Sequence, residues 1–397
     1  MSFDTSDTPP IESQPKLWRD LLAGFSVAGL LLPEAVAYAA IAGVPPMHAL
    51  LAALVGVCVY PLLGTSRFAI VAPTSSAAAI FASAVGVGGA DMGYALVLLT
   101  GALFFLAGAL RAGFLGAFIS RPVLRGFAWG LAVTIIVKQL PHIVGVHVAG
   151  TKAIQVVAGL WAELGQAHGL SVQIGAVALL LWLVLYHGLR RFVFVPQSLI
   201  VLGLGMAASV LFDFEARGVA LVGQIDGQAL QLHLPDISAE HWLRAAEIAP
   251  ALLLILFAES WGSVRSLALQ TGDRVDANRE MLAFGASNAI SALLQGLPVG
   301  AGFSAAAANH AAGGRSKWAS FASGAALALL LWQARAWLAL LPLPVLAAVV
   351  VGILSHNLWP KAVLKGLRLG GDAWLAVMAA VGALVFGVLF GLLLAVG

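Results

Sequence analysis

Charged side chains are scarce in this sequence: Asp, Glu, Lys and Arg together make up only 10% of its 397 residues. A soluble domain carries about 25% charged residues, so the low share excludes an ordinary soluble protein. Hydrophobic residues account for 61% of the chain, and the mean hydropathy is +0.97. The composition therefore predicts a protein that lies mostly within a lipid bilayer.

Cysteine and the common catalytic motifs are also nearly absent. The single Cys58 has no disulfide partner within the chain and is expected to be a buried structural thiol. No HExxH, GxSxG or GKS/T motif occurs, and the histidines lack metal-ligand spacing. We therefore expect no enzyme, no metal and no cofactor.

The basic residues are scattered between apolar segments, although the net charge is +3. This distribution is typical of topology signals at a membrane surface and disfavours a nucleic-acid partner. Lys16 and Arg19 precede the first apolar segment, which predicts a cytoplasmic N-terminus in the inner (plasma) membrane.

The order of segments predicts four parts. Residues 1–16 are expected to form a disordered cytoplasmic tail, 17–212 a first set of seven segments, 213–245 an acidic extracytoplasmic loop, and 246–397 a second set of seven. An odd-numbered repeat enters the membrane from the opposite side the second time, so the two sets form an inverted pair. The apolar segments lie at about 21–32 (continuing past Pro33), 49–63, 73–87, 94–110, 122–140, 170–187, 196–212, 248–268, 281–297, 304–313, 318–341, 343–356, 373–386 and 388–397.

Two helix starts occupy corresponding places in the two sets. In the first, the β-branched run at 70–71 leads to Pro73 and then to Thr74, Ser75 and Ser76 before an Ala-rich helix. In the second, residues 295–304 lead through Ser304 into another Ala-rich stretch. Free N–H groups and the partial positive charge of two such half-helices form an anion site without a cationic side chain. The alternative is that both are ordinary caps of packed helices.

Two carboxylates fall within apolar segments. Glu34 and Tyr38 share a helix face at a spacing of four residues, and Glu259 and Ser263 repeat that spacing. A charged group at membrane depth costs ~2.5–3.5 kcal/mol or more, so such residues are functional by default. Glu34 as a structural cap and Glu259 as a partner of Arg265 are the alternatives. Tyr38 and Phe303 provide apolar walls or belong to the core.

Several motifs together carry a family resemblance. The first half contains LLPEAVAYAAIAGVPP and YPLLGTSR, and the second contains AESWGSVRSLALQ, DRVDANREM and QGLPVGAGFS. In order and spacing the sequence resembles the SulP family of anion transporters, the sulfate permeases. The resemblance implies an all-α polytopic membrane protein with fourteen transmembrane segments in two inverted repeats of seven. It also implies a core domain that moves against a gate domain, and short strands before the half-helices of segments 3 and 10.

The resemblance also implies roles for particular residues. Matched to the family's motifs, the substrate site falls on Glu34, Tyr38, Thr74, Ser75 and Ser304, and the cation-coupling region on Glu259 and Ser263. With the neighbours that share these helix starts, the substrate-binding candidates are Glu34, Tyr38, Thr74, Ser75, Ser76, Phe303, Ser304 and Ala305; the coupling candidates are Glu34, Glu259 and Ser263. Ala305 and Ala306 stand where relatives often carry an arginine, and the C-terminal STAS domain of relatives is expected to be missing.

These observations predict a secondary active transporter of a small anion of the sulfate, bicarbonate or dicarboxylate class. Because no arginine balances Glu34, proton-coupled symport is the first hypothesis, with the lipid bilayer, the anion and a proton as partners. The alternatives are sodium-coupled symport through Glu259, a nucleobase-type carrier of the same fold, and an anion channel or voltage-responsive motor. A homodimer is compatible with the sequence.

Overall fold

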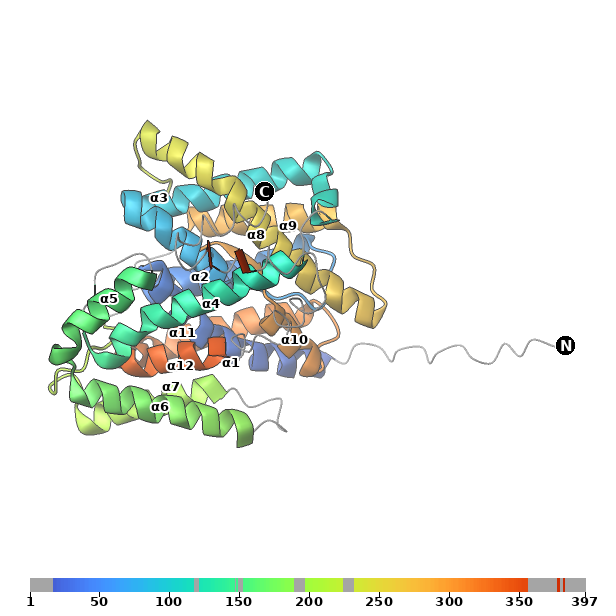
Figure 1. Ribbon diagram of the computed structural model, residues 1–397. Helices are drawn as coiled ribbons and strands as arrows, with labels where there is room; N and C mark the ends of the chain where they lie inside the picture. Colours follow the sequence, from blue (N-terminus) through green and yellow to red (C-terminus); the bar gives the residue numbers. More distant parts are fainter. Residues whose placement is uncertain are drawn as a thin grey trace.

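The computed structural model of the chain is shown in Figure 1 and describes residues 17–117, 121–146, 148, 153–188, 197–223, 232–355, 377–378 and 381–382. The expected tail 1–16, the last segment 388–397 and most of 373–386 lie outside the described residues. Within the described residues, five helices are long and apolar enough to cross a membrane: α1 (Leu17–Ala42), α2 (Pro46–Leu63), α3 (Ser75–Ala109), α6 (Gly169–Gly188) and α8 (Ala239–Thr271).

The described helices pack into two groups. In the core group, α3 packs against α8 and α9, while α1 packs against α2 and α11. In the gate group, α12 packs against α4, α6 and α7, and α5 packs against α4. Helix α1 contacts α7 and α12, and therefore links the groups. The remaining bounds are α4 (Arg121–Val144), α5 (Ala153–Glu163), α7 (Gln197–Phe212), α9 (Ala277–Leu293), α10 (Phe303–Ala311), α11 (Trp318–Ala339), α12 (Leu343–Ser355), η1 (Ala112–Ala117) and η2 (Leu164–Gln166).

Two short strands pair at the centre of the core group. Strands β1 (Val71–Pro73) and β2 (Val299–Ala301) are antiparallel, and Val71 lies opposite Ala301. Each strand leads within two residues into its half-helix, α3 or α10. Backbone groups at membrane depth need partners within the protein, and the two strands supply them to each other. The sequence places these two extended stretches correctly.

The two separate segments expected at 73–87 and 94–110 correspond to two helices that meet within α3. The range Ser75–Ala109 has non-helical backbone at Gly88 and Gly89. Gly89 has φ of +76°, a conformation that glycine adopts without strain, so the glycine pair ends the first helix and lets the second start in a new direction. Helix α8, by contrast, differs from the expectation: it begins at Ala239, inside the range expected to be a loop, because the Ser238 hydroxyl caps it.

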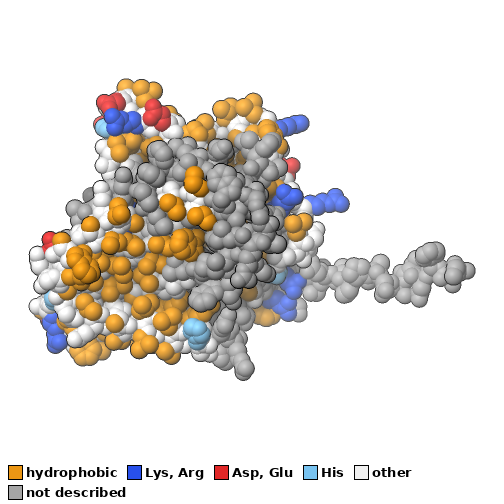
Figure 2. All heavy atoms as spheres, in the orientation of Figure 1, with side chains coloured by type: hydrophobic (Ala, Val, Ile, Leu, Met, Phe, Trp, Pro, Cys, Tyr) orange, Lys and Arg blue, Asp and Glu red, His pale blue; other side chains and the backbone are white. Residues whose placement is uncertain are grey.

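Large apolar side chains cover much of the outer surface. Trp332 is 82% exposed and Leu211 is 77% exposed. On the face shown in Figure 2, hydrophobic atoms form a broad area, with Lys and Arg side chains at its margins. Cys58 is exposed on α2, so the expectation of a buried thiol is wrong. In a multi-pass membrane protein an outward position on a spanning helix faces lipid, where a small apolar side chain is stable.

Candidate functional site

The strand pair brings together the N-terminal ends of two helices. Helix α3 starts directly after β1, and the Thr74 side chain caps it by accepting a hydrogen bond of 3.4 Å from the Ala77 N–H. Helix α10 starts after β2 at Gly302, whose residue type provides no side-chain cap. Because β1 and β2 run antiparallel, both helix starts flank the same short pair. Each end presents unpaired N–H groups and a partial positive charge of about half an elementary charge.

A carboxylate from the opposite half of the chain lies at each helix start. The Ser76 hydroxyl at the start of α3 donates to Glu259 Oε2 of α8 at 2.6 Å. The Ser304 hydroxyl at the start of α10 donates to Glu34 Oε1 of α1 at 3.4 Å. We refer to these two interactions as the crossed pairs. The first half supplies the hydroxyl in one pair and the carboxylate in the other.

The two crossed pairs differ in exposure. In the α3 pair, Ser76 is 1% exposed and Glu259 is partly exposed. In the α10 pair, Glu34 is 5% exposed, but Ser304 is exposed and the neighbouring Phe303 is 54% exposed. A hydrogen bond of 3.4 Å is long for two oxygen atoms, whereas 2.6 Å is short. The α3 end is therefore closed by its carboxylate, and the α10 end is open.

Tyr38 lies in the neighbourhood of both Glu34 and Glu259. It is nearly buried on α1, one turn beyond Glu34. Glu34 and Tyr38 therefore lie close together on α1, as expected from their spacing of four residues.

No cationic side chain balances these carboxylates among the residues with described side chains. The ion pairs found there join other residues, and Arg265 is exposed without an ion pair to Glu259. The alternative in which Glu259 is the ion-pair partner of Arg265 therefore has no support in the structure. Ala305 is 3% exposed, so its methyl group packs inward and only its backbone is available to a ligand.

The remaining candidates lie at the edges of this arrangement. Thr74 Oγ1 lies 3.1 Å from Ser76 Oγ, and Ser75 is partly exposed at the first position of α3. Ser263 is buried, and its hydroxyl donates to the Gly302 carbonyl at 3.4 Å, so it holds the chain between β2 and α10. Asn309, a further polar side chain of α10, donates to the Phe68 carbonyl at 3.1 Å.

Comparison with known sequences identifies the family. The sequence profile described as "Sulfate permease family" matches residues 17–381. The chain belongs to the sulfate permease family. A probable sulfate transporter of Mycobacterium tuberculosis (strain CDC 1551 / Oshkosh) is 33% identical over 341 residues, which cover 84% of this chain and 60% of the relative. "Sulfate transporter 4.1, chloroplastic" of Arabidopsis thaliana is 26% identical over 391 residues, covering 95% of this chain and 57% of the relative. The chain thus spans about three fifths of the length of these relatives.

Solved structures similar to this sulfate permease family member show the same fold. The transmembrane domain of the cyanobacterial bicarbonate transporter BicA matches with a TM-score of 0.85 at 22% identity, covering 96% of this chain and 97% of that chain. The murine Solute Carrier 26 family member A9 anion transporter matches with a TM-score of 0.89 at 19% identity, covering 98% and 68% respectively. The predicted fold class, a mostly helical membrane protein of this transporter fold, is confirmed, and the number of fourteen segments stays a prediction.

Sequence reasoning missed the residues that hold the two strands in place. The Ser260 hydroxyl accepts a hydrogen bond of 2.8 Å from the Ala301 N–H, and Asn288 bonds both backbone groups of Val299 at 2.9 Å. Glu280 accepts bonds from the Tyr60 hydroxyl at 2.7 Å and from the Thr65 N–H at 2.6 Å. The available signal was a polar side chain within or beside an apolar segment, which membrane proteins keep only where it has partners.

Proposed function

We propose that this chain carries a small anion across the membrane by alternating access, with the anion bound between the starts of α3 and α10. One observation supports this most directly. Two helix N-termini flank one strand pair, and the α10 start is exposed at Phe303 and Ser304. Helix N-termini favour anions, and discontinuous helices in this arrangement are typical of transporter sites. Movement of the core group against the gate group would then open the site to either side of the membrane.

We further propose that anion uptake is coupled to a proton at Glu34. An ionised Glu34 would repel a substrate anion bound at the α10 start. At ~5 Å and an effective dielectric constant of about 20, the repulsion of two unit charges is ~3 kcal/mol. Protonation of Glu34 removes its charge and with it this repulsion. Protonation is needed because the described side chains supply no cation that could offset the charge of Glu34.

Sodium coupling at Glu259 is the second candidate. The Glu259 carboxylate, the Ser76 hydroxyl and the Thr74 hydroxyl form a connected group of oxygen atoms. Oxygen atoms are the ligands that hard cations prefer. In this alternative a sodium ion would neutralise the Glu259 carboxylate. Ser263 would hold the neighbouring backbone at Gly302 in place.

The names of the relatives and the chemistry of the site together support a proposed substrate class. The relatives are named as sulfate transporters, and BicA is named as a bicarbonate transporter. We propose sulfate, bicarbonate or a small dicarboxylate, because each carries negative charge on oxygen atoms that accept hydrogen bonds from N–H groups. We also propose the plasma membrane as the location, with a cytoplasmic N-terminus, from the basic residues that precede α1.

Uptake by purified protein in liposomes tests these proposals. Labelled sulfate, bicarbonate and succinate are supplied with and without an inward proton gradient, in buffers that lack sodium. We expect one anion to accumulate only when the proton gradient is present. Accumulation that occurs only when sodium is added would show that sodium, and not the proton, is the coupling ion. Movement of a neutral solute without any anion would contradict the anion site itself.

A further inference from the structure

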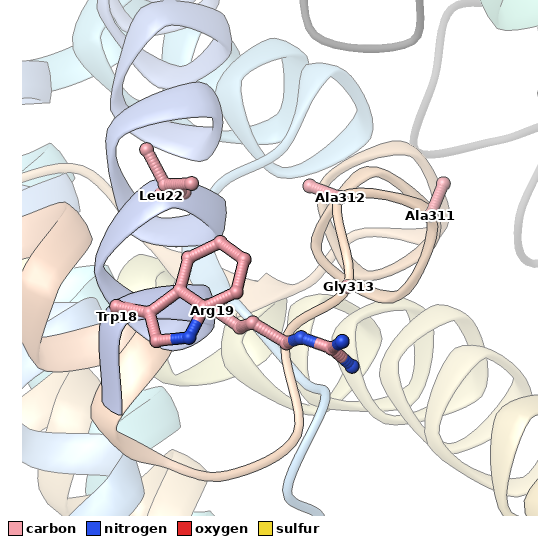
Figure 3. Close-up of a pocket in the computed structure, with 6 residues that line it drawn as sticks. All are labelled: Trp18, Arg19, Leu22, Ala311, Ala312 and Gly313. Atoms are coloured by element: carbon pink, nitrogen blue, oxygen red, sulfur yellow. The ribbon is translucent and has the colours of Figure 1, made fainter. Parts of the chain in front are cut away.

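A cavity lies between the first turn of α1 and the last turn of α10 (Figure 3). It has a volume of about 200 Å³ and is lined by Trp18, Arg19, Leu22, Ala311, Ala312 and Gly313. That volume suits a small polar group and excludes a whole lipid molecule.

Arg19 is the only charged residue that lines this cavity. Its side chain is half-buried, and in Figure 3 the guanidinium group extends toward the last turn of α10. Among the described residues the Arg19 side chain has no hydrogen bond or ion pair. It makes a cation–π contact with the Trp18 ring, and the guanidinium carbon lies 5.5 Å from the ring centroid. A half-buried cation without a counter-charge favours an anionic ligand.

The neighbouring carboxylate does not supply the missing charge. Asp20 is 1% exposed and accepts hydrogen bonds from the N–H groups of Arg315 at 2.7 Å and Ser316 at 3.1 Å. The Ser316 hydroxyl also donates to Asp20 at 2.5 Å. Through these hydrogen bonds the Asp20 carboxylate binds the segment that follows α10. Asp20 therefore fixes the wall of the cavity, and Arg19 has no counter-charge in the part of the chain that the structure describes.

An exposed apolar stripe continues from the cavity along α1. Trp18, Leu22 and Phe25 are 54%, 52% and 58% exposed. Their spacing of four and three residues places them on one face of the helix. Trp and Arg are typical anchors at the boundary between lipid headgroups and hydrocarbon. The surface therefore offers a cation at one end and a hydrocarbon contact along its length.

We propose that this cavity binds the phosphate group of an anionic phospholipid, with Arg19 as its counter-charge and an acyl chain along the stripe. Helices α1 and α10 also carry Glu34 and Ser304 of the candidate transport site. A lipid held between them would stabilise one relative position of these two helices. The proposal does not depend on which ion is transported.

Retention of defined lipids by the purified full chain tests the proposal. Delipidated protein is mixed with equal amounts of phosphatidylglycerol and phosphatidylcholine, and bound lipid is counted by native mass spectrometry. We expect phosphatidylglycerol to be retained preferentially. We expect Arg19→Gln to lower that preference about fivefold, since a basic residue near an anionic lipid surface contributes about that much. Retention of phosphatidylcholine in the same sample checks that each variant is folded.

Two further variants separate the cavity from general surface charge. Ala311→Phe places a ring in the cavity without removing the cation and should also lower phosphatidylglycerol retention. Arg265→Gln removes an exposed arginine outside the cavity and should leave retention unchanged. Unchanged retention in Arg19→Gln, or equal losses in Arg19→Gln and Arg265→Gln, would overturn the proposal. Glycerol phosphate that binds as tightly as the lipid would overturn it too, in favour of a site for soluble phosphate.

Discussion

The Ser76 hydroxyl donates a 2.6 Å hydrogen bond to the Glu259 carboxylate, which joins the start of α3 in the first half of the chain to α8 in the second. A carboxylate at a helix N-terminus takes the place that a bound anion would take. In the other crossed pair, Ser304 and Glu34 are 3.4 Å apart and the helix start is exposed. One helix end is therefore occupied by a carboxylate, and the other is accessible to a ligand.

Replacing Ser76 with alanine should weaken transport. The substitution removes the donor to Glu259, and a hydrogen bond to a charged group is worth about 1.5–3 kcal/mol. We expect the initial rate of anion uptake at low substrate concentration to fall at least roughly tenfold. Ser83→Ala is the matched control on the same helix, because the Ser83 hydroxyl bonds only the Ile80 carbonyl. Equal losses in the two variants would point to a general defect of α3.

Replacing Glu34 with glutamine should abolish the pH dependence of uptake. If the anion binds when Glu34 carries a proton, wild-type uptake falls as the pH rises and the protonated fraction shrinks. Glutamine is neutral at every pH, so Glu34→Gln should give a flat profile and no accumulation driven by a proton gradient. The measurement is the initial uptake rate over a pH series without sodium. Glu247→Gln, at an exposed position of α8, is the control. A wild-type slope in Glu34→Gln would assign the coupling elsewhere.

Local sequence signals located both half-helices but gave no information on their supports. The Pro73-Thr74 pair predicts the start of α3, and the structure has Thr74 as its cap. The glycine-rich approach to Ser304 likewise predicts the start of α10. Both signals are local, because a cap involves residues within one turn.

The crossed pairs and the strand supports depend on contacts between distant residues. Ser304 and Glu34 are 270 residues apart, and Thr65 and Glu280 are 215 apart. A single sequence offers no spacing rule for such contacts. In the sequence, polar residues within apolar segments indicate which side chains need partners. The partners themselves are known only from the three-dimensional structure. The same holds for Ser263, whose hydroxyl bonds a backbone carbonyl.

Replacing Gly56 with alanine should destabilise the strand pair. A Cβ atom at Gly56 would lie 2.2 Å from the Val71 carbonyl oxygen and 2.8 Å from its carbon, so the backbone of β1 would have to move. Overpacking of this kind costs about 1–3 kcal/mol. We expect a lower midpoint of thermal unfolding in detergent and a loss of uptake. Gly86→Ala is the control, since a Cβ atom there meets no atom within 4 Å. Similar midpoints for the two variants would show that β1 tolerates the shift.

Replacing Asn288 with alanine should lower stability more than the same change at Asn309. Both asparagines are 0% exposed. The Asn288 amide donates to the Val299 carbonyl at 2.9 Å and accepts from the Val299 N–H at 2.9 Å, so its loss leaves two buried backbone groups of β2 without these partners. Each unsatisfied group costs about 1–3 kcal/mol, so the two groups together predict a loss of about 2–6 kcal/mol for Asn288→Ala. Asn309 donates one bond, to the Phe68 carbonyl, and its Oδ1 atom is buried without a partner, so Asn309→Ala also removes an unfavourable group. Thermal unfolding of both variants in one detergent compares them, and an equal or larger loss for Asn309→Ala would mean that β2 does not depend on Asn288.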